Sequence, residues 1–318
     1  MKLIAYLAAI GLMTLGASCL LGMSKAHRAP LIVAAGDIAC GGKRSAPAGG
    51  PVDTDASCHM RGTAALIAAL NPDAVLPLGD LQYSEDDFGG FERGYNKTWG
   101  RFKSISHPVV GNHEYDDRDA GGYFRYWGAR AGEPGKGWYS YDLGGWHLIA
   151  LNGEGGGPSV GGCQKGSAQW LWLQADLRSH PSGCRLAYWH QPRFSTGPHG
   201  NNSVYADFWD LLYAAQVDVV LNGHDHDYER YAPLNPKEKS DPNGIREFIV
   251  GTGGKNHSPF FYPINTSITR QNVSFGVLAM TLYRDRFAWR YVAEPGASYR
   301  DSGMALCHRS STLRPGSG

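Results

Sequence analysis

Gly79-Asp80-Leu81-Gln82-Tyr83 follows the apolar run Ala74–Leu78, which is typical of a strand buried on both faces. The glycine lets the chain turn sharply, and the aspartate places a hard oxygen donor at the end of the strand. Four further apolar runs end in the same kind of residue: Gly36-Asp37, Gly111-Asn112-His113, His190 and Gly223-His224. In open α/β sheets, the loops at the carboxyl ends of the strands converge on one crevice. We therefore expect an α/β fold with one shared site at these strand ends.

Strand-like and helix-like segments alternate along the rest of the chain. Buried strands are expected at Leu31–Ala35, Ala74–Leu78, Pro108–Val110, Arg185–Trp189 and Val217–Leu221. A hairpin is expected over Trp138–Leu143 and Trp146–Asn152, and antiparallel strands over Glu247–Val250, Phe275–Leu282 and Arg286–Val292. Helices are expected over Met60–Leu70, from an N-cap at Ser167 to Leu177, and over Val204–Ala215. We predict one catalytic domain over residues 30–293 and an irregular tail over residues 294–318.

The N-terminus has the pattern of an export signal. Lys2 precedes the apolar run Leu3–Gly22, and Ser24-Lys25-Ala26 supplies a small-x-small cleavage pattern, which predicts a signal peptide over residues 1–26. The run is also about long enough for a retained membrane anchor, and Cys19 would bear the lipid if the chain is a lipoprotein. Each interpretation places the rest of the chain outside the cytoplasm, either secreted, periplasmic or on the cell surface.

Composition and charge restrict the class of partner. Apolar residues make up 42% of the 318 residues and charged residues 19%, as in ordinary globular proteins. The formal net charge of +1 lacks the basic excess of a nucleic-acid-binding surface. We expect no nucleic-acid partner, and no membrane partner beyond a possible N-terminal anchor.

The cysteine spacing fits an oxidising compartment. Cys40 and Cys58 bracket a loop rich in glycine, proline and alanine, and Cys163 and Cys184 bracket one expected helix. We therefore predict Cys40–Cys58 and Cys163–Cys184 disulfides, which leaves Cys307 over. A cysteine metal site is the rival interpretation, but the sequence has no Cys-x-x-Cys pair.

The polar residues at the strand ends form a set of metal donors. Hard oxygen and borderline nitrogen donors of this kind suit Zn, Fe, Mn or Co, and the set contains no thiolate. Its members are Asp37, Asp80, Asn112, His190, His224 and His226.

The order Gly-Asp, Gly-Asp, Gly-Asn-His-Glu, His and Gly-His-x-His, which spans residues 36–226, resembles that of the calcineurin-like metallophosphoesterases. Gly79–Tyr83 is similar to the Gly-Asp-x-x-Tyr motif of the purple acid phosphatases within that superfamily. The resemblance implies a four-layer sandwich of two mixed sheets flanked by helices, with two metal ions. The first ion would be held by Asp37, Asp80, Tyr83 and His226, and the second by Asp80, Asn112, His190 and His224, with Asp80 as the bridge.

The same resemblance suggests two catalytic histidines and an iron-containing pair. His113 matches a non-ligand histidine that contacts substrate phosphate. His199 more loosely matches a second substrate-facing histidine, and a surface histidine is the alternative. Tyr83 favours Fe(III) at the first position, with Zn, Fe or Mn(II) at the second, because phenolate is a hard anionic donor. Asp37-Ile38-Ala39 departs from the usual Asp-x-Gly, and the short stretch before Asp37 suggests a single-domain, bacterial-type form.

The expected function is that of an exported acid-type phosphomonoesterase acting on a small phosphate ester. Two ions would neutralise the phosphoryl oxygens and lower the pKa of bound water, so that hydroxide attacks. A phosphodiesterase or nucleotidase using the same site, and a non-catalytic exported metal-binding protein, remain alternatives. Substrate choice is expected in the loops, where aromatic residues would either stack on a leaving group or pack the loops together: Tyr95, Trp99, Tyr123 and Trp127.

Overall fold

The computed structural model describes residues 28–40, 58–83, 87–154, 160–263 and 266–308. The predicted signal peptide and Cys19 lie outside these residues. Within the described part of the chain, no helix combines the length and the apolar character needed to cross a membrane.

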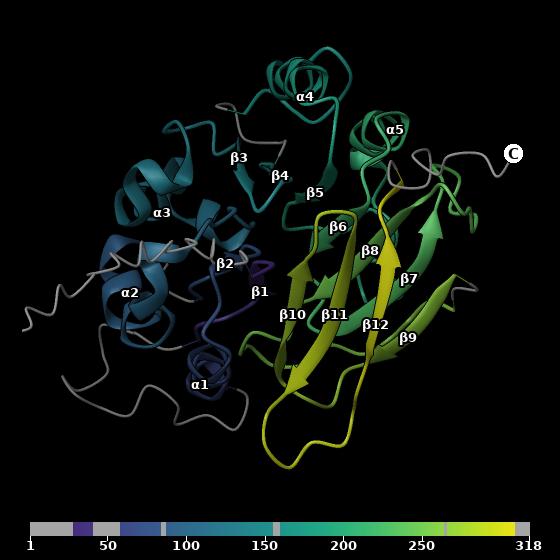
Figure 1. The fold of residues 1–318 in the computed structure, drawn as a ribbon. Coiled ribbons are helices and arrows are strands. Elements are labelled where there is room, and N and C mark those ends of the chain that lie inside the picture. Colours follow the sequence, from purple (N-terminus) through teal and green to yellow (C-terminus); the bar gives the residue numbers. More distant parts are fainter. Residues whose placement is uncertain (1–27, 41–57, 84–86, 155–159, 264–265, 309–318) are drawn as a thin grey trace, which may run out of the picture.

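Two mixed β-sheets pack face to face, and helices flank them (Figure 1). The smaller sheet has the order β12 (Ser302–Leu306), β11 (Arg286–Ala293), β10 (Gly276–Leu282), β1 (Leu31–Ala35) and β2 (Ala74–Pro77). The larger has the order β3 (Tyr139–Leu143), β4 (Trp146–Ala150), β5 (Cys184–Tyr188), β6 (Val219–Asn222), β8 (Ile245–Val250), β7 (Tyr228–Leu234) and β9 (Ser267–Gln271). The α-helices are α1 (Met60–Leu70), α2 (Phe88–Arg93), α3 (Gly121–Trp127), α4 (Ala168–Ser179) and α5 (Ala206–Ala214). The expected fold class is confirmed.

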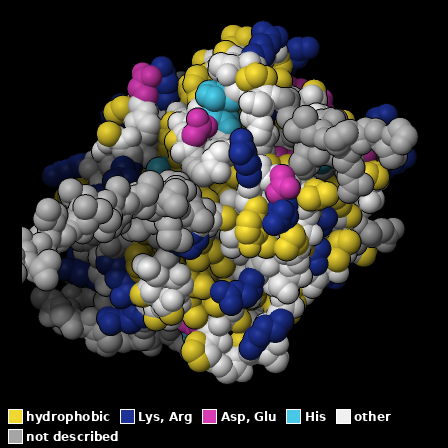
Figure 2. Space-filling model, in the orientation of Figure 1, with side chains coloured by type: hydrophobic (Ala, Val, Ile, Leu, Met, Phe, Trp, Pro, Cys, Tyr) yellow, Lys and Arg dark blue, Asp and Glu magenta, His cyan; other side chains and the backbone are white. Residues whose placement is uncertain are grey.

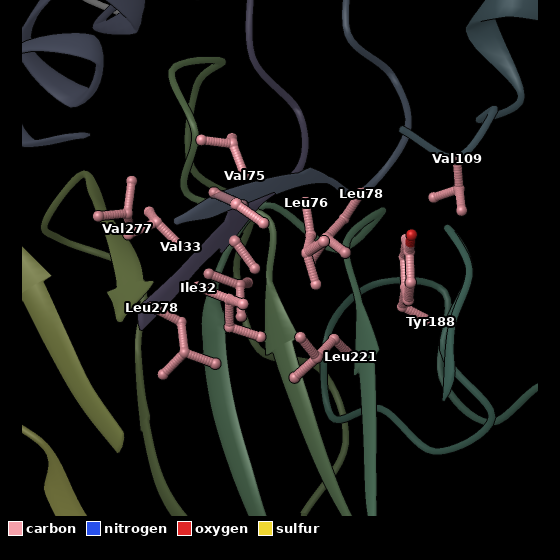
Figure 3. Packing of buried hydrophobic residues seen from close by; sticks show 14 of the residues in the cluster. Ile32, Val33, Val75, Leu76, Leu78, Val109, Tyr188, Leu221, Val277 and Leu278 are labelled. Atoms are coloured by element: carbon pink, nitrogen blue, oxygen red, sulfur yellow. The ribbon is translucent and has the colours of Figure 1, made fainter. Parts of the chain in front are cut away.

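Successive side chains of the central strands point to opposite faces of the sheet, and this divides the core into two layers. On β5, Leu186 and Tyr188 belong to the cluster between the sheets, whereas Ala187 packs in a second cluster with residues of α4 and α5. Figure 3 shows Tyr188 and Leu221 of the larger sheet in one packed layer with residues of β1 and β2. Because both faces of these strands are covered, their sequences read as continuous apolar runs.

Local signals set the start of α4 and the end of α1 as predicted, whereas α4 runs two residues beyond its predicted end at Leu177. The Ser167 hydroxyl accepts a hydrogen bond from the backbone N–H of Trp170 and caps α4. Helix α1 ends at Leu70, where Asn71 adopts a left-handed conformation with φ of 47° before Pro72.

The prediction of an irregular tail after Glu294 is wrong, because β12 pairs with β11 at the edge of the smaller sheet. The register places Gly303 opposite Trp289, and a Cβ at Gly303 would lie 2.4 Å from the indole ring. Gly303 therefore leaves room for the Trp289 ring within a paired strand. On the face seen in Figure 2, hydrophobic side chains lie between Lys and Arg side chains over this sheet.

One of the two predicted disulfides is wrong. Cys40 is bonded to Cys58 as predicted, but Cys184 is bonded to Cys307. Cys184 packs in the core between the sheets, and Cys163 is buried in the cluster on the other face of the larger sheet. The sheet therefore separates the two cysteines that the sequence spacing paired.

Candidate metal centre

Strand pairing brings the predicted ligands together. β1 and β2 are parallel neighbours, so their carboxyl ends place Asp37 and Asp80 side by side. β5 and β6 are also parallel, and the backbone N–H of Gly223 donates to the carbonyl of His190 at 2.8 Å, which aligns His190 with His224. The site therefore lies where the carboxyl ends of the parallel strands of both sheets meet, as expected for loops at strand ends.

Glycines in these loops allow close approach. Gly79 has φ of +84°, and a Cβ there would lie 2.6 Å from the His190 ring. A Cβ on Gly111 would lie 2.2 Å from a carboxylate oxygen of Asp80. The sequence predicts that these glycines allow a sharp turn. In the structure they also allow the loops to pack closely.

Three candidate ligands adopt a backbone conformation that non-glycine residues rarely populate. The φ angles are 60° at Asp37, 49° at Asp80 and 72° at His224. Such conformations cost on the order of 1–3 kcal/mol each and persist only where the surroundings impose them, which is common at functional sites. The backbone is held in the shape that aims these side chains inward.

Tyr83 lies at the centre of the first group of donors. Its hydroxyl is 2.8 Å from Asp37 Oδ1, 3.1 Å from Asp80 Oδ2 and 3.1 Å from His226 Nε2. His226 Nε2 is also 3.2 Å from Asp37 Oδ1. One hydroxyl proton serves only one of these neighbours at a time, so the group is rich in acceptors and suits a cation.

The second group shares Asp80 with the first. His190 Nε2 lies 3.3 Å from Asp80 Oδ2 and 3.3 Å from His224 Nδ1, and one ligand atom from each of these residues falls within 4.8 Å of the others. The side-chain oxygen of Asn112 is buried and has no hydrogen-bond partner among the described residues. A buried amide oxygen without a partner is costly, and this one is satisfied if it binds an ion. Both groups therefore fit the two-ion assignment.

Burial and neighbouring charges shift the pKa values of the side chains in this site. Burial would raise the pKa of Asp80, but charged His190 outweighs it and lowers the pKa of this carboxyl. Burial and the neighbouring Asp37 and Asp80 raise the pKa of Tyr83 well above its ordinary value. Burial, and next the charge on His190, lower the pKa of His224 to about 3. Metal binding would displace the protons on His190 and Tyr83, since ligands bind in their deprotonated forms.

Backbone carbonyls orient two of the histidines. His190 Nδ1 lies 2.7 Å from the carbonyl of Leu78, and His226 Nδ1 lies 2.7 Å from the carbonyl of Asn256. Each contact fixes the ring so that Nε2 points into the centre, a common arrangement for ligating histidines.

Two buried carboxylates that the sequence analysis did not assign to the site support the loops. Glu114 accepts hydrogen bonds from the backbone N–H groups of Asp80, Leu81 and Gly111, at 3.0, 2.7 and 2.7 Å. Asp225 lies between the two histidines of Gly223-His224-Asp225-His226 and accepts from the hydroxyl of Ser195. Both residues sit inside motifs that the sequence showed, and their contacts to other loops reveal their positioning role.

His113 and His199 face the centre from opposite loops. His113 Nε2 is 3.9 Å from Asp80 Oδ2, and its Nδ1 is 3.0 Å from Asp116 Oδ2. The His199 ring lies 4.0 Å from that of His224, and a hydrogen bond to Asp225 raises the pKa of His199. The structure therefore brings all nine predicted site residues to one region.

Ala39 stands where the related phosphoesterases usually have glycine, and the backbone at this position explains why alanine fits. Ala39 forms a bridge with Gln82 and is absent from the residues with positive φ. No glycine is required at this position, so the replacement leaves the placement of Asp37 intact.

Comparisons with known proteins agree with this geometry. The family model for calcineurin-like phosphoesterases matches residues 30–228, more than half of the chain. Purple acid phosphatase 21 of Arabidopsis thaliana is 36% identical over 127 residues, which cover 37% of this chain and 26% of that protein. Purple acid phosphatase 22 of the same plant is 28% identical over 219 residues, covering 60% of this chain and 47% of that protein. The chain thus spans less than half the length of these curated relatives.

A solved structure supports the fold. The purple acid phosphatase PPD1 from yellow lupin (Lupinus luteus) seeds has a TM-score of 0.69 at 22% identity, covering 90% of this chain and 55% of that one. Among the curated relatives is also a probable inactive purple acid phosphatase 9 of Arabidopsis thaliana, 22% identical over 292 residues, which cover 72% of this chain and 42% of that protein. The chain therefore belongs to the calcineurin-like phosphoesterase family and is a distant relative of the purple acid phosphatases.

Proposed function

We propose that the protein is an exported acid-type phosphomonoesterase that uses two metal ions. The observation that carries this proposal is the convergence of Asp37, Asp80 and His226 on the Tyr83 hydroxyl, together with the contact of His190 to the same Asp80 carboxylate. One carboxylate shared by two groups of donors is what a bridged pair of ions requires.

The residues divide between the two ions as the family motif implies. Asp37, Asp80, Tyr83 and His226 would hold Fe(III), and Asp80, Asn112, His190 and His224 would hold Zn, Fe or Mn(II). Such a pair, when bound, neutralises phosphoryl oxygens and supplies hydroxide near neutral pH by lowering the pKa of water.

Basic side chains around the centre suit an anionic substrate. The Lys255 ammonium lies 5.1 Å from the centre of the Tyr83 ring, and the His113 ring lies 4.5 Å from the same ring. His199 is half exposed beside His224 on the other side. In this proposal His113 donates a proton or a hydrogen bond to the phosphoryl or leaving oxygen, and Asp116 orients its ring.

Export is part of the proposal. The two disulfides and the relationship to purple acid phosphatases support an oxidising compartment outside the cytoplasm.

Turnover of a chromogenic phosphomonoester by metal-replete protein tests the function, with a diester and a nucleotide as comparison substrates. Turnover of the diester or the nucleotide in preference to the monoester would assign the site to a phosphodiesterase or a nucleotidase. No turnover with two ions bound would identify a non-catalytic metal-binding protein.

His113→Ala is expected to leave metal content intact and lower kcat by roughly 10²-fold or more, the range for loss of a positioned acid or charge stabiliser. Asp116→Asn should produce a smaller loss, because His113 remains but loses its charged partner. Wild-type turnover in metal-loaded His113→Ala would remove His113 from the mechanism.

A further inference from the structure

The aromatic residues that face solvent near the metal centre are not the ones that the sequence suggests for stacking on a leaving group. The four loop aromatics that were candidates for stacking on a leaving group are buried and pack the loops together: Tyr95, Trp99, Tyr123 and Trp127. Phe261 and Tyr262, in contrast, are 63% and 49% exposed. Both belong to the segment Lys255–Tyr262, which follows β8 and leads toward β9.

The beginning of this segment is fixed by the metal centre itself. The backbone N–H of Lys255 donates to the carbonyl of Asp37 at 2.8 Å. The carbonyl of Asn256 holds His226 Nδ1 at 2.7 Å, and the backbone N–H of Ser258 donates to the carbonyl of His226 at 3.0 Å. The segment therefore starts directly beside the first group of donors.

The end of the segment is fixed by the loop that carries His199. The N–H groups of Phe261 and Tyr262 both donate to the carbonyl of Thr196, at 2.9 and 3.1 Å. Thr196 is held in turn by buried Glu229, which accepts from the Thr196 N–H at 2.8 Å and from its hydroxyl at 2.7 Å. The two exposed rings therefore stand on an anchored backbone.

Close contacts lead from the metal centre to these rings. The His199 ring lies 4.0 Å from the ring of the ligand His224. The next residue is Gly200, where a Cβ would lie 2.9 Å from Cε2 of Tyr262, so the Tyr262 ring rests against the backbone of Gly200. Tyr262 thus packs against the residue that follows His199, and the His199 ring in turn lies against a candidate metal ligand.

We propose that Phe261 and Tyr262 form a leaving-group subsite that binds the aromatic ring of a phosphate monoester. The inference rests on the proposed function and adds its substrate class. In this proposal the ester oxygen of a phosphoryl group at the ions lies on the His199 side, with His113 on a phosphoryl oxygen, so that a ring on the ester oxygen extends toward the two exposed side chains. Aromatic pairs are stabilised beyond their buried area, whereas a small alkyl group gains little from the same surface.

The test compares benzyl phosphate with ethyl phosphate, because both are esters of primary alcohols and differ in the ring. In metal-loaded protein, Phe261→Ala/Tyr262→Ala should lower the ratio of kcat/KM for benzyl over ethyl phosphate by roughly tenfold, mainly through KM, as expected for the loss of one or two ring contacts. Inhibition by inorganic phosphate should change much less, since phosphate does not reach the subsite.

Two matched variants serve as controls. Phe261→Tyr/Tyr262→Phe keeps both rings and should retain most of the ratio. Leu171→Ala/Met304→Ala removes exposed side chains on α4 and β12, 52% and 59% exposed, and should leave the ratio at its wild-type value.

An unchanged ratio in Phe261→Ala/Tyr262→Ala would overturn the subsite while leaving the phosphomonoesterase proposal in place. Hydrolysis of neither ester by metal-replete wild type would overturn the proposed function, and the subsite with it.

Discussion

Tyr83 is the residue on which the proposed identity of the first metal rests. Its hydroxyl lies within 3.1 Å of Asp37, Asp80 and His226, and burial and the two carboxylates raise its pKa well above the ordinary value. The phenol therefore stays protonated unless a cation replaces its proton. A strongly Lewis-acidic ion such as Fe(III) suits this exchange better than Zn or Mn(II).

We predict a violet colour in the iron-loaded wild type, from charge transfer between phenolate and Fe(III), and its loss in Tyr83→Phe. Activity should fall modestly, because Asp37, Asp80 and His226 remain. Tyr95→Phe is the matched control, since its buried hydroxyl has no hydrogen-bond partner within the described ranges. An absorption spectrum recorded with metal analysis checks this, and a visible band that survives in iron-loaded Tyr83→Phe would refute the ligand assignment.

At the scale of elements, His147 connects the β3–β4 hairpin to α4. Its Nδ1 lies 2.8 Å from Asp142 Oδ1, its Nε2 lies 2.7 Å from Asp176 Oδ2, and its ring stacks on His180 at 3.8 Å. Burial opposes protonation, but the hydrogen bonds to Asp176 and Asp142 outweigh it and raise the pKa of His147. Both ring nitrogens therefore donate, and the charged form is the stabilising one.

The raised pKa predicts how stability depends on pH. The contribution of His147 is fully present below its unfolded pKa of about 6.5 and is lost as pH rises through the folded pKa. His147→Gln should lower the free energy of unfolding by about 1–3 kcal/mol at acidic pH, as for loss of hydrogen bonds between charged groups. Urea unfolding from pH 6 to pH 9 should show this difference shrinking, and a difference that stays constant would contradict the prediction.

At the scale of the whole molecule, the Cys184–Cys307 disulfide joins the start of β5 in the larger sheet to the end of β12 in the smaller one. It closes a sequence separation of 123 residues, whereas Cys40–Cys58 closes 18. Cross-links over longer loops restrict the unfolded chain more. The disulfide is therefore expected to hold the last strand against the rest of the protein.

Cys184→Ser/Cys307→Ser should lower the free energy of unfolding by about 2–5 kcal/mol, and by more than Cys40→Ser/Cys58→Ser does. Urea denaturation of the metal-loaded variants measures both. Non-reducing peptide mapping should link Cys184 to Cys307, and a Cys163–Cys184 peptide would show that the pairing in the structure is wrong.

The sequence by itself determined the fold class, most strand positions and the residues gathered at the centre. Asp37 and Asp80 each follow a buried parallel strand, and the ends of neighbouring parallel strands are adjacent in any such sheet. The Ser167 cap is predictable from the sequence because capping depends on groups only three residues away. These features are local, or follow from a local pattern repeated in neighbouring strands.

Only the tertiary structure decided the partner of Cys184, the pairing of β12, and which aromatic rings reach solvent. Periodicity reports that a segment is buried, but not which face of which sheet covers it. Cys163 and Cys184 are close in sequence yet pack on opposite faces of one sheet, while Cys307 reaches Cys184 from the far end of the chain. The backbone of Phe261 and Tyr262 is held by Thr196, more than sixty residues earlier, and both side chains are exposed. These features depend on contacts between segments that are far apart in the sequence. A short stretch of sequence contains only one of the two contacting residues.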